Sequence, residues 1–219
     1  PPTDPNSTPL DPGLTISWTK PPASWRRPHH RSVIAVDGIS SQVLAVPASD
    51  PVGTSYSKVI TDPSIANGSN VGFSVSGRNS ALSALANWNK ASGTGHPAGP
   101  PVIVSAPNVS VDDDNGASAS LDWTGAFDNN GRTISNYYAT IFSPGGSAPS
   151  CTETGAVPGS PSVPSQSSTF QYLGTSTSTT FTGLRANNPY DFVVYAFNGM
   201  GCTASVTVAS GLSNASAVA

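Results

Sequence analysis

The chain has 219 residues, of which 21 are Gly and 21 are Pro, and only 10% are charged. This length suits two domains of about a hundred residues each, and the many turn formers favour short strands over amphipathic helices. The formal charge of −3, without a long basic stripe, argues against nucleic acid as a partner. No apolar run approaches the roughly 20 residues that span a bilayer, so we expect no membrane insertion by this fragment.

In the first half, alternating apolar and polar residues predict a series of strands. Residues 14–20 place Leu14, Ile16 and Trp18 on one buried face. Further strands are expected at 32–37, 42–46, 55–61, 71–79 and 84–88, and the proline-rich segment 1–12 is expected to supply an irregular edge strand.

The loop 21–31 joins two of these strands and is the expected recognition surface of the first half. Its candidate partner-binding residues are Trp25, Arg26, Arg27, His29, His30 and Arg31. Trp and Arg are enriched in interface hot spots, and prolines limit the ordering cost of binding. Because the histidines gain charge on mild acidification, an acidic partner should then bind more tightly. The alternative is a solvated basic loop with Trp25 folded over its own sandwich edge.

Residues 90–101 show no apolar period and contain several prolines, which predicts a linker. We therefore expect a first domain at 1–91, a linker at 92–100 and a second domain at 101–219. Strands in the second domain are expected at 102–111, 117–124, 134–142, 169–174, 179–184, 190–198 and 203–209.

The two halves resemble each other. Trp123 repeats the pattern of Trp18, and residues 71–79 align with 190–198 so that Phe73 matches Phe192 and Val75 matches Val194. An internal repeat of about a hundred residues indicates duplicated domains.

Three features of the sequence resemble fibronectin type III. They are the early Trp of each half, Leu184 followed by Tyr190, and the run Phe-x-Val-x-Ala-x-Asn ending at Asn198. This resemblance implies an all-β fold of two immunoglobulin-like β-sandwiches in tandem, with Leu184 and Tyr190 at the corner before the sixth strand. The first half is divergent, since Val71 stands where the corner Tyr is expected. The composition also resembles that of bacterial, especially actinobacterial, surface modules.

Residue types suited to catalysis are sparse. The three histidines fall in the loop 21–31 and in the expected linker, and no nucleophile, phosphate or zinc motif occurs. We therefore expect no enzyme, no cofactor and no metal. The acidic runs at 112–116 and 128–131 contain Asn and Gly and are interpreted as turns rather than as calcium sites.

Cys151 and Cys202 both fall in the second domain, so we expect one disulfide and an oxidising compartment. Phe127, Arg132 and Met200 are further candidate partner-binding residues in the loops 125–132 and 198–201. Phe127 and Met200 are expected either to pack between the domains or to bind a ligand.

The resemblance implies an extracellular, monomeric, non-catalytic module of a surface or secreted protein. We expect it to capture a host or matrix protein, or a cytokine by analogy with two-module receptor ectodomains. The alternative is a structural spacer in a larger secreted or cell-wall enzyme or surface protein.

Overall fold

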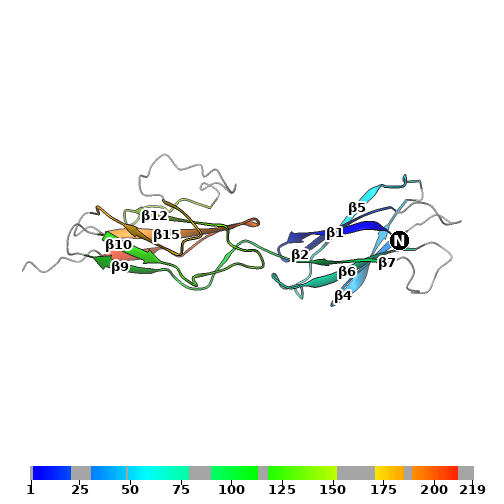
Figure 1. Ribbon diagram of the computed structural model, residues 1–219, viewed down its shortest axis with the longest axis horizontal. Helices are drawn as coiled ribbons and strands as arrows, with labels where there is room; N and C mark the ends of the chain where they lie inside the picture. Colours follow the sequence, from blue (N-terminus) through cyan, green and yellow to red (C-terminus); the bar gives the residue numbers. More distant parts are fainter. Residues whose placement is uncertain are drawn as a thin grey trace, which may run out of the picture. The chain divides into compact units, whose positions relative to one another are not determined.

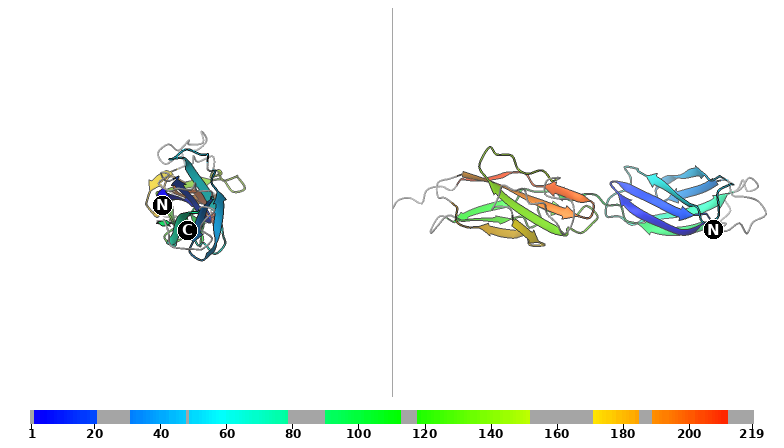
Figure 2. Two further views of the ribbon diagram at one scale, coloured as in Figure 1. Left: turned by 90° about the vertical axis from the view of Figure 1, so that its right-hand side faces the viewer. Right: turned by 90° about the horizontal axis from the view of Figure 1, so that it is seen from above.

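The computed structural model describes residues 2–20, 31–47, 49–78, 90–112, 118–151, 171–184 and 189–211. The chain divides into two compact units, Pro1–Gly99 and Pro100–Ala219. Across these described ranges the secondary structure consists of strands and turns, and no helix is long and apolar enough to cross a membrane. Each unit is a stack of two antiparallel sheets, as Figures 1 and 2 show from different directions. The expected all-β sandwich fold is therefore confirmed.

The first unit contains a three-stranded and a four-stranded sheet. The three-stranded sheet has the order β1 (Thr3–Leu10), β2 (Gly13–Thr19) and β5 (Ser55–Ile60). The four-stranded sheet has the order β4 (Ile39–Ala45), β3 (Arg31–Val36), β6 (Val71–Arg78) and β7 (Lys90–Gly95). The proline-rich start is a strand of eight residues with a register shift between Thr3 and Asn6, which agrees with the irregular edge strand expected there.

Strand β7 contradicts the expected linker. Its residues 90–95 pair with residues 71–76 of β6, so the last strand of this sandwich lies where the sequence suggested a connection. The pattern was missed because the core-facing positions are Ala91, Gly93 and Gly95, which carry almost no apolar surface. A Cβ on Gly93 would lie 2.6 Å from Cζ of Phe73, so the large ring fills the space above the glycine. The strand expected at 84–88 lies outside the described residues.

The second unit has the same architecture. One sheet has the order β14 (Ser178–Phe181), β10 (Ser118–Asp122) and β9 (Asn108–Asp112). The other has the order β13 (Gln171–Gly174), β12 (Asn136–Phe142), β15 (Pro189–Asn198) and β16 (Gly201–Ala204), with β17 (Val208–Gly211) also paired to β15. A short ribbon joins β8 (Val102–Ile103) to β11 (Phe127–Asp128).

Two expected strands of the second unit are split. The expected strand 102–111 is divided into β8 and β9, with Pro107, which lacks an N–H donor, between them. The expected strand 203–209 is divided at Ser205, whose hydroxyl accepts the N–H of Val194 at 3.0 Å in place of a ladder carbonyl. Ser205 N–H still donates to the Val194 carbonyl at 2.7 Å.

Cross-strand register is the same in both units. Ile34 pairs with Val75 in the first unit, and Ala139 pairs with Val194 at the matching position in the second. All four residues are fully buried. The sequence repeat is therefore a repeat of strand pairing as well as of residue type.

The expected core is present with one exception. Trp18, Trp123, Phe73, Phe192 and Val194 are buried, each with at most 4% of its surface exposed. Tyr190 was expected to be buried but is only half-buried, and it packs on the rim of the core together with Leu184. It lies near the start of β15, where the apolar interior ends and an amphipathic ring is well suited.

Candidate functional site

In the first unit the structure places only one of the six candidate residues from the loop 21–31. Arg31 is the first residue of β3 and is exposed. Trp25, Arg26, Arg27, His29 and His30 lie outside the described residues. Their part in recognition stays a prediction.

In the second unit, residues 128–131 form the turn that the sequence predicted. The N–H of Asn130 donates to Asp128 Oδ1 at 2.6 Å, and the N–H of Gly131 donates to Asn129 Oδ1 at 3.1 Å. Asn130 and Gly131 both have positive φ, 50° and 87°, a conformation that Asn and Gly tolerate. Local side-chain hydrogen bonds therefore fix this loop. The other expected turn falls mostly on 113–117, outside the described residues.

Asn198, at the end of β15, ties this loop to its neighbour. Its Nδ2 donates to the carbonyls of Asn129 and Arg132 at 3.1 and 3.2 Å, and its Oδ1 accepts the N–H of Met200 at 2.8 Å. The side chain is buried, so these bonds are sheltered from water. We call residues 128–132 and 198–200 the loop junction.

The loop junction brings together two of the predicted partner-binding residues. Arg132 Nη1 donates to Met200 Sδ at 3.8 Å, and the guanidinium lies against Gly199, where a Cβ would be only 2.5 Å from Arg132 Cζ. Arg132 is exposed and Met200 is half-buried. The sequence suggested each residue separately but gave no sign of their contact. The contact is possible because Gly199 has no side chain, which leaves room for the guanidinium.

The sequence predicted that Phe127 lies in a polar loop, but the structure places it in a strand. It belongs to β11, its ring lies 5.9 Å from that of Tyr137, and it packs half-buried on the core of its own unit. The pairing of β11 with β8 turns the ring inward. A role for Phe127 in binding therefore has less support than one for Arg132 or Met200.

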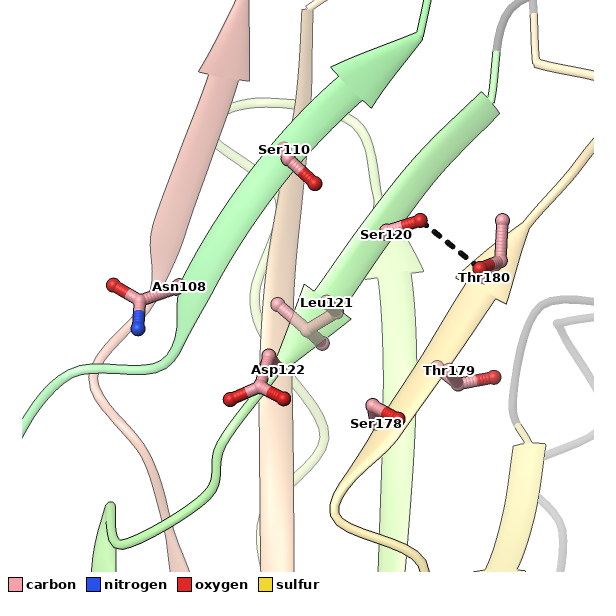
Figure 3. A pocket seen from close by; sticks show the side chains of 8 residues that line it. All are labelled: Asn108, Ser110, Ser120, Leu121, Asp122, Ser178, Thr179 and Thr180. Carbon is pink, nitrogen blue, oxygen red and sulfur yellow. Dashed lines mark hydrogen bonds between the residues drawn. The ribbon is translucent and has the colours of Figure 1, made fainter.

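A shallow hollow of about 290 Å³ lies on the outer face of the sheet β14-β10-β9. Cross-strand register arranges six polar side chains there in two rows, Asn108, Asp122 and Ser178 in one and Ser110, Ser120 and Thr180 in the other. Figure 3 shows them on neighbouring strands, with a hydrogen bond of 3.0 Å between the hydroxyls of Ser120 and Thr180. All six are exposed, so a ligand there would compete with water at every contact.

The expected disulfide between Cys151 and Cys202 is present in the structure. It fastens residues 143–151 over the outer face of the sheet that contains β12, β15 and β16. Beneath this segment lies a second apolar cluster that the sequence did not predict, formed by Tyr138, Val193, Tyr195 and Phe197. The hydroxyl of Tyr195 donates to the Pro149 carbonyl at 2.7 Å. We call residues 143–151 the strap.

Burial raises the pKa values of the Tyr137 and Tyr138 phenols, with a further contribution from Tyr172 in the case of Tyr138. Over the described ranges, no group of three His, Cys, Asp or Glu residues is placed to hold a metal ion.

Comparison with known protein families decides the family. The model of the fibronectin type III domain matches residues 100–209. The chain belongs to the fibronectin type III family. The match covers the second unit, and the first unit repeats its strand order and register. Fibronectin type III domains are generally non-catalytic, and they commonly mediate protein binding or act as spacers.

No curated protein sequence matches the chain. The chain is similar to the solved structure of chicken CNTN1 FN1-FN3 domains with 15% sequence identity and a TM-score of 0.40. That alignment covers 97% of this chain and 64% of that chain, so the chain spans less than two thirds of its length.

Proposed function

We propose that this chain is a non-catalytic protein-binding segment of an extracellular protein, acting as a monomer. We further propose that it belongs to a bacterial surface protein and captures a host or matrix protein, with cytokines among the candidate ligands. The loop junction is the observation that supports binding most directly.

Three features of the loop junction suit it to a protein partner. Its backbone is held by the side-chain bonds of Asn198 and Asp128, so little conformational entropy remains to be lost on binding. It presents an Arg and a Met side by side, and both residue types are enriched in protein interfaces. A spacer would need neither feature.

The proposal can be tested by surface plasmon resonance. The immobilised chain would be exposed to a panel of purified extracellular-matrix proteins and cytokines. We expect saturable binding to at least one of them, weakened at least tenfold, about 1.4 kcal/mol, by Arg132→Ala combined with Met200→Ala. Thr133→Ala, which changes an exposed residue of the same segment, is the matched control.

Two further variants, measured in the same experiment, locate the binding site. Gly199→Ala should displace the Arg132 guanidinium and weaken binding while leaving both loops in place. The triple variant Trp25→Ala, Arg26→Ala, Arg27→Ala measures the contribution of the loop 21–31 separately. Absence of saturable binding across the panel would favour the spacer.

A further inference from the structure

Charge is distributed unevenly between the two units. Residues 1–99 contain seven of the nine Lys and Arg but five of the twelve Asp and Glu, a formal charge of +2, and residues 100–219 carry −5. Within the first unit, residues 12–36 and 63–99 contain six Lys and Arg and no Asp or Glu. Strands β3, β6 and β7 all come from these two stretches.

Strand register places two of these cations, Arg31 and Lys90, near one end of one sheet face. Ile34 and Val75 face the core, so the positions that alternate with them face outward. Arg31 lies in the outermost outward row. The next row runs from Val43 on β4 through Val33 and Ser76 to Lys90 on β7. Arg31 and Lys90 are exposed, as is 56% of Val43.

We call Arg31, Val43, Ser76 and Lys90 the basic face. The carboxylate carried by this sheet, that of Asp37, follows the far end of β3 and lies against Gly72. Six residues of strand separate it from Arg31, about 20 Å. The carboxylate of this sheet is therefore too far from Arg31 to pair with it, so an external carboxylate can take that place.

We infer that the basic face binds an acidic, extended segment of a partner protein. Arg31 and Lys90 lie two strands apart and two residues apart along the strands, about 12 Å. That is about the span of four residues of extended chain, whose side chains face the same side, so two Asp or Glu residues separated by three others would meet both cations. Val43 extends the surface with an apolar contact. The inference rests on the proposed function and names the chemistry of the partner.

The probe is a rhodamine-labelled synthetic peptide with two Glu separated by three Ser and followed by a Val, and the control peptide has Gln in place of Glu. We expect fluorescence anisotropy to show binding of the Glu peptide at low salt, weakening as salt is added. Arg31→Gln combined with Lys90→Gln should weaken binding at least tenfold. Ser55→Glu combined with Ser57→Glu, exposed on the other sheet of the same unit, lowers the net charge equally and should have a much smaller effect.

A second readout confirms that the variants fold. Both double variants change only exposed side chains, so each should keep an unfolding temperature close to that of the parent chain. A stable variant that loses the Glu peptide supports the basic face. Equal binding of the Glu and Gln peptides, or equal loss in both double variants, would overturn it.

The outcomes separate this inference from the proposed function. If the Glu peptide does not bind but the chain still captures a protein of the panel, the basic face is wrong and the proposed function stands. If sedimentation instead shows salt-sensitive self-association that Arg31→Gln abolishes, the occupant is the acidic unit of a second copy, and a foreign acidic partner is ruled out.

Discussion

At the scale of single residues, the two core tryptophans differ in one hydrogen bond. The Trp18 indole N–H donates to Ser32 Oγ at 3.2 Å in a buried site. Nε1 of Trp123 is also buried but has no hydrogen-bond partner among the described residues. Tyr137 occupies the register position of Ser32, and its ring lies 5.7 Å from that of Trp123. At this position the second unit has an aromatic contact, whereas the first unit has a hydrogen bond.

This difference predicts unequal costs for the same substitution. Trp18→Phe removes the donor from a buried hydroxyl, whereas Trp123→Phe removes a donor that is unsatisfied. We expect Trp18→Phe to cost about 1 kcal/mol more than Trp123→Phe, the net value of one hydrogen bond. Hydrogen–deuterium exchange of peptides from each unit measures the two stabilities separately.

Ser32→Ala is the control, because it gives Trp18 the unsatisfied N–H that Trp123 already has. It should destabilise the first unit and remove the difference between the two Trp→Phe variants. Equal costs for both Trp→Phe variants in the parent chain would show that the Ser32 bond adds no net stability.

At the scale of elements, prediction from the sequence succeeded where side chains are large. A period of two predicts β2 from Leu14, Ile16 and Trp18. The same period predicts β15 from Phe192 and Val194. The same rule fails for β7, because a strand whose inward positions are Ala and Gly carries no apolar signal. Such a strand is recognisable only once the bulky residues opposite it are known.

The candidate site was predictable in composition but not in arrangement. Asn198 ends a recognisable motif in the sequence, yet its bonds to Asn129 and Arg132 depend on where two distant loops meet. The strap was missed for a similar reason. The strap covers Tyr195 only because Cys202 lies close to Cys151 in the folded chain. The local sequence at 143–151 gives no sign of this covering position.

Strand β7 gives a prediction at this scale. Gly93→Ala would place a Cβ 2.6 Å from the Phe73 ring, which is itself buried and cannot move freely. Overpacking of this kind costs about 1 to 3 kcal/mol, and we expect that loss in urea unfolding of the first unit. Ser92→Ala is the matched control, since Ser92 is exposed on the opposite face of the same strand. If both variants unfold alike, β7 does not pack against Phe73 as described.

At the scale of the whole molecule, the two units share a fold but differ in how they are stabilised. In the first unit the described core lies between its two sheets. The second unit has such a core and, in addition, an apolar layer beneath the strap on the outside of one sheet. The single disulfide lies in this added layer, so the units should respond differently to a reducing agent.

We therefore predict that dithiothreitol destabilises the second unit alone. The Cys151–Cys202 bond closes a loop with a sequence separation of 51 residues, and a crosslink of this length contributes about 2 to 4 kcal/mol. Amide exchange should accelerate in β12 and β15, where Tyr138 and Tyr195 lose the cover of the strap, and should be unchanged in β2 and β6. The double variant Cys151→Ala, Cys202→Ala should reproduce this pattern without reductant. Unchanged protection of β12 and β15 in that variant would mean that packing and the Tyr195–Pro149 hydrogen bond hold the strap without the disulfide.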